Sequence, residues 1–475
     1  FEFRYIYFLL YFYFLGFAML FTPELGLNGS EVARVPNQII VKYKDPSFSP
    51  LATSTNAPSA TVSPDVSPSF KYTALYPGQI DVVIIEGENI QLLLEELKID
   101  PNVEYVEPNY IMQVHGITFE RSDLPDDTDF GKQWALESSS SASGTDIDFL
   151  NAQALSRKST PDGPVIIGIA DSTFDIQHQD LMNQLWVNEE EIPNNGIDDD
   201  GNGYVDDIHG FDFANSSPNV NGEDDHGSHV AGICAAEKNN LRGICGAFPN
   251  VKFIALACSI GEDNLSVIAL LQSIDYIIQL KNRGYNIVAI NASFGSNIYS
   301  QLGYEAVENL SDHGIILCTA AGNDGCNLDL EEDLNRNGFL DAEEDLNGNG
   351  ILDVVYPNNF DLPNIISVAS INNNRELASY SNYGLKEVDL VAPGVDIYST
   401  INRIDPNNIQ YDYKSGTSMA TPFVTAAVAF AAHNFPNETM GQRRARVLSN
   451  VVTLSSLSDK VVTGGVLNLR KIVDT

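Results

Sequence analysis

The sequence predicts an α/β fold with a mostly parallel sheet, preceded by a small α+β unit. From Pro164 onward, apolar strand-like segments alternate with longer amphipathic segments. This alternation is typical of a parallel sheet that helices cover on both faces. At 475 residues, of which 43% are apolar, the chain is long enough for roughly two or three units. Glycine and proline are scattered along it, so we expect most of the chain to be globular.

The first segment, residues 1–22, carries Arg4 and then an almost unbroken apolar run from Tyr5 to Phe21. This pattern is typical of an export signal, with a truncated start because the first residue is Phe. An uncleaved membrane anchor is the alternative. We favour a cleaved signal, because the run is short for a spanning helix of about 20 residues and no basic flank follows it. We therefore expect a secreted or extracytoplasmic protein that keeps no stable membrane anchor.

The second segment, residues 37–115, is the predicted α+β unit. Its runs QIIVKYK, IDVVIIEG and YVEPNYIMQV are strand-like, and IQLLLEELKID has apolar residues at helical spacing. The Ser/Pro/Thr-rich stretch from Pro46 to Phe70 predicts a flexible insertion. Residues 116–150 are then expected to form an exposed linker, because Asp123 to Phe149 is acidic and rich in Ser and Gly.

The third part, residues 151–475, carries the strand-like segments PVIIGIADS, VKFIALAC, NIVAINASF, GIILCTAAGN, NIISVAS and VDLVAPG. Between them, Asn264–Lys281 and Tyr304–His313 have apolar residues at helical spacing and are predicted helices. In parallel sheets of this kind, reactive groups lie at the carboxyl ends of the strands. Several polar motifs fall at those ends.

The chain is strongly acidic, with 64 Asp and Glu against 26 Lys and Arg and a formal net charge of -38. This charge repels nucleic-acid phosphates and anionic membrane surfaces, so we exclude a nucleic-acid partner. Clustering of the acids favours neutralisation of a share of them by bound divalent cations. The five cysteines are an odd number, so at least one is unpaired in a monomer, and we interpret them as small buried apolar residues with or without one disulfide.

Three segments contain the residue types that nucleophilic acyl transfer needs: a nucleophile, a base and a carboxylate. Asp171 ends VIIGIAD, His226 begins HGSHVAGICAA, and Ser418 in SGTSMATP opens an apolar helix. A serine hydroxyl needs a base to take its proton and a carboxylate to orient that base. Free N–H groups at a helix start can stabilise an oxyanion, and Asn323 in TAAGNDG is the candidate side-chain donor. Singly, such residues are more often helix caps and turn residues.

Taken together, these sequence motifs resemble those of the subtilase family of serine proteases. HGSHVAG and SGTSMATP, with Asp171 upstream in the order Asp, His, Ser, carry the resemblance, which covers roughly Phe130 to the C-terminus. It implies a subtilisin-like three-layer fold and a serine endopeptidase that hydrolyses protein or peptide substrates through an acyl-enzyme. It makes His226, not His229, the base and Asn323 the oxyanion donor. One departure is Thr173, where the family usually has Gly.

The resemblance also implies a substrate site. Ser293, Phe294 and Gly295 would form a substrate-binding strand, and the pocket for the residue before the scissile bond would be lined by Ala320, Ala321 and Gly322. The small residues of that lining would admit large side chains.

Residues 37–115 resemble the inhibitory propeptide of the same family. The resemblance implies that YVEPNYIMQVH occupies the cleft until removal, which makes the propeptide an intramolecular inhibitor of a self-processing zymogen. The mature enzyme would start shortly after His115, with residues 116–150 as its linker and N-terminal arm. A small independent domain is the alternative.

Three acidic segments have the spacing of EF-hand calcium loops. DLNRNGFLDAEE supplies a full ligand set, with Phe339 contributing its backbone carbonyl: Asp333, Asn335, Asn337, Phe339, Asp341 and Glu344. Two partial copies lack the carboxylate at position twelve, where Tyr356 and His209 stand, and comprise Asp345, Asn347, Asn349 and Asp353, and Asp198, Asp200, Asn202 and Asp206. An ion in the last copy therefore needs a carboxylate from elsewhere. We interpret these segments as structural calcium sites, with no cofactor for catalysis; acidic solvated loops are the alternative.

Two other functions share these features. An inactive calcium-binding adhesion or scaffold module could keep the fold, because a fold alone does not establish activity. An esterase or peptide ligase could use the same acyl-enzyme step. The complete set of Asp171, His226, Ser418 and Asn323 favours the active protease.

Overall fold

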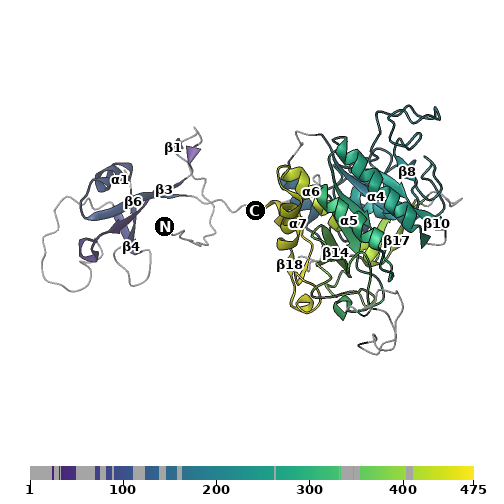
Figure 1. The fold of residues 1–475 in the computed structure, drawn as a ribbon. Helices are drawn as coiled ribbons and strands as arrows, with labels where there is room; N and C mark the ends of the chain where they lie inside the picture. The colour runs from purple at the N-terminus through teal and green to yellow at the C-terminus, as the bar shows by residue number, and fades with distance from the viewer. Residues whose placement is uncertain are drawn as a thin grey trace. The chain divides into compact units, whose positions relative to one another are not determined.

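A computed structural model describes residues 24–25, 31–32, 34–49, 70–74, 82–87, 90–110, 124–137, 146–157, 163–261, 264–330, 332, 346, 353–402 and 410–474. The chain divides into two compact units, Phe1–Ile117 and Thr118–Thr475 (Figure 1). None of the helices in the described part of the chain has the length and apolarity that a membrane crossing requires. The predicted signal, residues 1–22, lies outside the described residues.

In its described residues, the first unit is an antiparallel sheet with one α-helix, which confirms its predicted α+β character. Its sheet has the order β4-β5-β3-β6, formed by β3 (Arg34–Tyr43), β4 (Phe70–Ala74), β5 (Val82–Gly87) and β6 (Val103–Tyr110). The core is made by Ile39, Val41, Val83 and Ile85 of the sheet and Leu94 of α1 (Ile90–Lys98). Shorter elements of this unit are β1 (Glu24–Leu25), β2 (Glu31–Val32) and η1 (Pro46–Phe48).

The second unit is built on a nine-stranded sheet in the order β18-β19-β15-β14-β13-β12-β7-β9-β8. All its neighbouring strands run parallel except β18 and β19. The strands are β7 (Val165–Asp171), β8 (Gly210–Asp212), β9 (Val251–Ala257), β12 (Ile287–Ala292), β13 (Ile316–Ala320), β14 (Ile365–Ile371), β15 (Leu390–Pro393), β18 (Val452–Thr453) and β19 (Gly465–Val466).

Helices cover both faces of this sheet, so the predicted three-layer α/β fold is confirmed. One face packs against α3 (His226–Ala235) and α6 (Thr417–Asn434), and the other against α4 (Val267–Asn282) and α5 (Gln301–Asp312). Along β7, Ile167 and Ile169 face the first layer and Ile166 the second, as the two-residue period of a strand dictates. The remaining elements are η4 (Phe130–Lys132), α2 (Phe149–Leu155), β10 (Ser259–Gly261), β11 (Asn264–Leu265), η5 (Leu328–Leu330), β16 (Ile397–Thr400), β17 (Tyr411–Lys414), α7 (Met440–Ser449), η6 (Ser455–Leu457) and α8 (Leu469–Val473).

The expectation of an exposed linker at residues 116–150 is wrong for part of that range. Phe130, Leu136, Ile147 and Phe149 are buried in the core of the second unit. These few apolar residues are enough to anchor a segment whose overall composition is acidic and rich in Ser and Gly.

Both predicted helix starts are wrong by one turn or less, and serine caps explain why. The Ser266 hydroxyl accepts a hydrogen bond from Ala269 N–H, so α4 begins at Val267 and Asn264 pairs in β11 instead. The Ser300 hydroxyl accepts from Gly303 N–H, so α5 begins at Gln301, before the predicted Tyr304.

Candidate active site

Asp171 and His226 form the closest polar contact of the candidate site. Asp171 is the last residue of β7 and is 2% exposed, and His226 is the first residue of α3. His226 Nδ1 lies 2.6 Å from Asp171 Oδ1, which also accepts a hydrogen bond from Ser172 N–H at 2.7 Å. A strand end and a helix start therefore place a buried carboxylate directly behind a partly exposed imidazole.

The charge of Asp171 sets the protonation of His226. Burial of the ring by itself lowers the pKa of His226, but the charge and hydrogen bond of Asp171 outweigh burial, so the pKa is raised above its ordinary value. His229, one turn further along α3, differs. It is fully buried, its Nε2 contacts the Asp412 carbonyl at 3.1 Å, and burial lowers its pKa to about 3.

Ser418 is the second residue of α6, one of the helices that pack against the first face of the sheet. Its hydroxyl donates to the Ser293 carbonyl at 3.1 Å, while the Ser293 hydroxyl donates to the Ser418 carbonyl at 2.8 Å. Within the described residues, the Ser418 hydroxyl has no hydrogen bond to His226. Such catalytic contacts are often long without substrate and tighten when it binds.

Thr417 determines how the Asn323 side chain points. Asn323 Oδ1 accepts from Thr417 N–H at 2.9 Å and from Thr417 Oγ1 at 3.0 Å. Both donors bind the amide oxygen, which leaves the Nδ2 group of this exposed side chain as its donor. Asn382 supports the same turn, because its Oδ1 accepts from the N–H groups of Asp324 and Cys326 and its Nδ2 donates to the Ala321 carbonyl.

The two predicted substrate segments are neighbours of these residues. Ser293, Phe294 and Gly295 directly follow the end of β12 at Ala292, and their part as a substrate-binding strand stays a prediction. The adjacent Ser296 pairs with Tyr356 through two backbone hydrogen bonds of 3.0 and 2.8 Å. Ala320 ends β13, Ala321 and Gly322 follow it, and the Ala320 carbonyl accepts from Asn358 Nδ2 at 2.8 Å.

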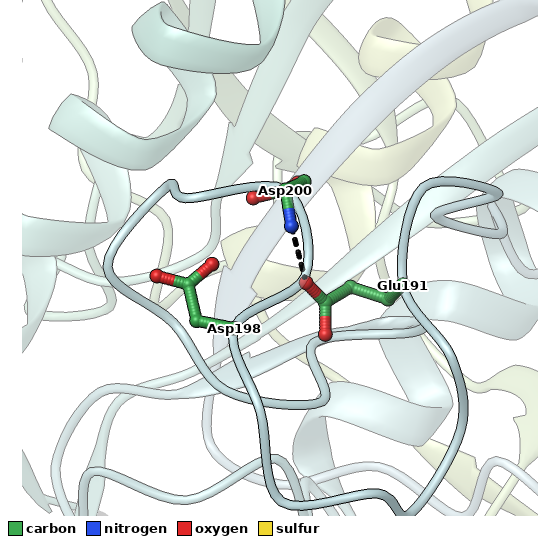
Figure 2. A group of neighbouring side chains, drawn as sticks. All are labelled: Glu191, Asp198 and Asp200. Atoms are coloured by element: carbon green, nitrogen blue, oxygen red, sulfur yellow. Dashed lines mark hydrogen bonds between the residues drawn. The ribbon is translucent and has the colours of Figure 1, made fainter.

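A separate acidic cluster lies in the loop before β8. Glu191, Asp198 and Asp200 each offer a carboxylate oxygen, and these oxygens lie within 4.8 Å of one another (Figure 2). Glu191 is 5% exposed and is held across the loop by the backbone N–H groups of Asp199, Asp200 and Asp206. The cluster could hold a metal ion. Glu191 precedes the motif, so the spacing of the motif does not indicate it.

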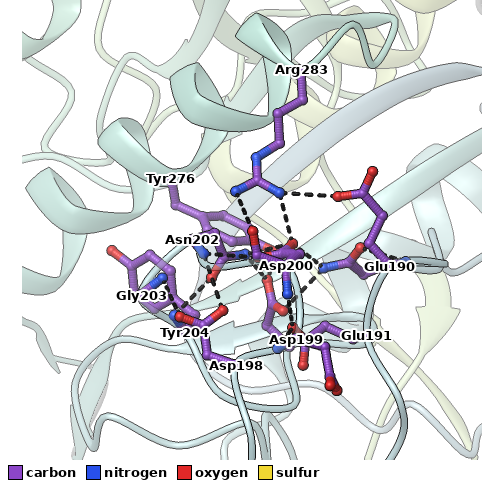
Figure 3. A network of polar contacts seen from close by, with 12 residues as sticks. Glu190, Glu191, Asp198, Asp199, Asp200, Asn202, Gly203, Tyr204, Tyr276 and Arg283 are labelled. Atoms are coloured by element: carbon purple, nitrogen blue, oxygen red, sulfur yellow. Dashed lines mark hydrogen bonds and ion pairs between the residues drawn. The ribbon is translucent and has the colours of Figure 1, made fainter.

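The other two predicted ligands of this copy have different partners. Asn202 donates its amide to Asp200 and Asp207, and the Asp206 carboxylate accepts from the N–H groups of Asn195 and Gly196. Arg283, which follows α4, pairs with Asp200 Oδ2 at 3.0 Å and with Glu190 at 3.1 Å (Figure 3). The arginine neutralises part of the charge, and the cluster remains acidic.

Most of the other predicted metal ligands lie outside the described residues: Asp333, Asn335, Asn337, Phe339, Asp341, Glu344, Asp345, Asn347 and Asn349. Asp353 is described and fully buried, and its N–H donates to Glu332 Oε2 at 3.2 Å. Glu332 is also fully buried and accepts from Leu346 N–H at 2.9 Å. This carboxylate therefore joins both ends of the segment that contains the second copy.

All five cysteines are buried and unpaired. Burial raises the pKa of the Cys318 thiol to about 12, so this thiol stays protonated and unreactive at neutral pH. The structure therefore has no disulfide among the five, and we assign the cysteines no part in the candidate chemistry.

Known protein families and individual proteases are similar to this chain in sequence. A family profile described as the subtilase family matches residues 162–468, and one described as the fervidolysin N-terminal prodomain matches residues 28–109. Subtilisin-like protease 1 of Plasmodium falciparum (isolate 3D7) is 33% identical over 316 residues, which cover 65% of this chain but only 43% of that protein. The thermophilic serine proteinase of Bacillus sp. (strain AK1) is 29% identical over 416 residues, 86% of this chain and 81% of the relative.

A solved structure shows the same fold. A protease from Pseudoalteromonas arctica superposes with a TM-score of 0.53 at 21% identity, over 74% of this chain and 98% of that one.

Proposed function

Because the chain belongs to the subtilase family, we propose that it is a secreted serine endopeptidase that hydrolyses peptide bonds through an Asp-His-Ser triad. The observation that carries this proposal is the contact of 2.6 Å between His226 Nδ1 and Asp171 Oδ1. That contact orients the free Nε2 of the ring as a base, and the apolar helix α6 presents Ser418 at its first turn.

In the proposed reaction, the Ser418 hydroxyl attacks the carbonyl carbon of the scissile bond and His226 Nε2 takes its proton. Asp171 accepts the hydrogen bond from Nδ1–H, which fixes the tautomer and stabilises the imidazolium. The carbonyl oxygen becomes negative and accepts from Asn323 Nδ2 and from a backbone N–H at the start of α6. His226 then returns the proton to the leaving amine, and water hydrolyses the acyl-enzyme by the reverse sequence.

The N-terminal unit is proposed to keep this site inactive until it is removed. The prodomain match over residues 28–109 and the antiparallel sheet with α1 support an inhibitory propeptide at residues 37–115. Its removal would leave residues 116–150 as the N-terminal arm and residues 151–475 as the peptidase domain. Export by the apolar segment at residues 1–22 completes the proposed zymogen pathway.

Calcium is proposed to stabilise the peptidase domain and takes no part in the chemistry. Oxygen ligands suit this ion, and Glu191 supplies the third carboxylate beside Asp198 and Asp200. The full ligand set from Asp333 to Glu344 is the second proposed site.

Self-processing tests the proposed enzyme and zymogen together. We expect wild-type protein, expressed in a host that lacks other proteases, to lose its N-terminal ~100 residues, a segment of small-domain size. The Ser418→Ala variant should accumulate as precursor, because it lacks the nucleophile. Intact-mass spectrometry separates the two products. Normal maturation of the alanine variant would refute self-processing, and a mature wild type that cleaves no peptide would refute the protease.

A further inference from the structure

The segment that follows the second acidic loop lies against both predicted walls of the substrate pocket. Tyr356 pairs through its backbone with Ser296, directly after the first wall, residues 293–295. Asn358 donates to the carbonyl of Ala320 in the second wall, residues 320–322. The residues between these two anchors, and the one just before them, must therefore run close to the space between the walls.

Val355 is the residue that reaches into that space. A Cβ on Gly295 would lie 2.5 Å from Val355 Cγ1, and a Cβ on Gly322 would lie 3.4 Å from Val355 Cγ2. One methyl group therefore packs on the backbone of each wall. Val355 is 6% exposed and belongs to a buried apolar cluster that includes Ala321. The residues of the two walls are small, but the Val355 side chain occupies the space between them.

Hydrogen bonds on either side hold Val355 in this position. Its N–H donates to Asn359 Oδ1 at 3.0 Å, and Asn359 Nδ2 donates to the Leu328 carbonyl at 3.1 Å. On the preceding side, the buried carboxylate of Glu332 accepts from Asp353 N–H. A valine has few rotamers, and this one has a fixed backbone, so a large substrate side chain cannot displace it without disrupting these contacts.

We propose that Val355 closes the pocket for the side chain that precedes the scissile bond, so that the enzyme selects small residues such as alanine over aromatic ones. This inference rests on the proposed function, because it places a substrate between the same two walls. The small residues of the walls by themselves would admit large side chains; Val355 supplies the missing wall.

The test compares two tetrapeptide 4-nitroanilides that differ only in ending with alanine or phenylalanine. Wild type should have the higher kcat/KM on the alanine substrate. Val355→Gly should raise kcat/KM on the phenylalanine substrate by about 10- to 200-fold, the range by which a hydrophobic pocket discriminates between substrates that differ by one methylene. Val355→Ala should give a smaller gain in the same direction. Titration of active sites with a serine-directed phosphonate normalises every rate.

Val354→Ala is the matched control. Val354 is the neighbouring buried valine, at 2% exposure, but it lines a different cavity together with Tyr304 and Phe360. It should leave the ratio of the two rates unchanged. If Val355→Gly does not fold, the wild-type ratio and the Val355→Ala variant decide.

A wild type that prefers phenylalanine overturns the inference, as does an unchanged ratio in Val355 variants that titrate fully. Both results leave the proposed function intact. A wild type that hydrolyses neither substrate and takes up no phosphonate overturns the proposed function, and the inference with it.

Discussion

The amide of Asn323 has one orientation because Thr417 donates two hydrogen bonds to its oxygen. The Nδ2 group is therefore available as a donor before substrate arrives and needs no reorganisation when charge develops. Preorganised donors of this kind act mainly on the transition state, in which the carbonyl oxygen is negative. At the scale of single residues, the proposed catalysis therefore depends on Thr417 as well as on the donor that it orients.

Asn323→Ala should lower kcat by about 10²–10³ with little change in KM, the size of effect known for the loss of one such donor. Thr417→Val is the graded variant. It removes the side-chain donor to Asn323 Oδ1 but keeps the backbone donor, so its loss of kcat should be smaller. Steady-state kinetics on a peptide ester measures both. A large rise in KM with unchanged kcat would show that Asn323 binds substrate instead.

The pH dependence of kcat/KM reports the charge around His226. The base must be neutral, so activity is present above the pKa of His226 and is lost as pH falls through it. Asp171 raises this pKa and Lys414 lowers it. Asp171→Asn should therefore move the acidic limb to lower pH and reduce kcat by about 10⁴. Lys414→Met should move the limb to higher pH. Shifts of equal sign in the two variants would contradict the assignment of this limb to His226.

Sequence motifs identify candidate residues better than they identify the partners of those residues. Asp171, His226 and Ser418 each lie in a short sequence motif. The contact of Asp171 with His226 follows because the end of a strand meets the start of a helix. The partners of Thr417 and Glu191 cannot be predicted in the same way. Thr417 meets Asn323 across 94 positions of the chain, and Glu191 reaches its loop from outside the motif. Such contacts depend on the tertiary fold rather than on spacing.

At the scale of elements, short caps and loop anchors decide where strands and helices begin and end. Ser266 and Ser300 start α4 and α5, and neither serine is distinguished by the apolar periodicity that predicts the helices. The loop before β8 depends instead on buried carboxylates. Asp207 is fully buried and accepts from Tyr276 and Asn202, and burial raises its pKa. The carboxylates of this loop repel one another, so the folded loop requires a cation that offsets their negative charge.

Chelation should therefore destabilise the mature protein. A ligand that binds only the folded state stabilises it by about 2.7 kcal/mol at a hundredfold excess over Kd. EDTA should lower the Tm of wild type, and Glu191→Gln should weaken calcium binding because it removes one carboxylate from the cluster. Glu189→Gln, at an exposed neighbouring position, is the matched control and should bind calcium like wild type.

Calorimetric melting with and without EDTA measures the stabilisation, and metal analysis of the purified protein measures the calcium content. Glu344→Gln separates the two proposed sites, because it changes only the loop from Asp333 to Glu344. A Tm that EDTA does not change, in a protein that copurifies without calcium, would mean that these segments are solvated acidic loops.

At the scale of the whole molecule, the predicted α/β class, the family and the α+β character of the N-terminal unit are confirmed. They could be predicted because each follows from a long pattern: alternating buried strands and helices, and extended motifs in a fixed order. The width of the substrate pocket could not be predicted from the sequence. It depends on where Val355 lies between two walls that are far apart in the sequence. The net charge of -38 is a whole-chain property that disfavours nucleic acid as a partner class, which stays a prediction, and it does not choose a substrate.

The most direct measurement of the central claim is covalent labelling of the mature protein with a serine-directed fluorophosphonate, followed by peptide mass mapping. A hydroxyl activated by His226 and Asp171 should react once per molecule, on the peptide that contains Ser418, with complete loss of peptide hydrolysis. Ser418→Ala and heat-denatured wild type should take up no label. Label on a different residue, or full peptide hydrolysis by protein labelled at Ser418, would contradict the assignment of Ser418 as the nucleophile.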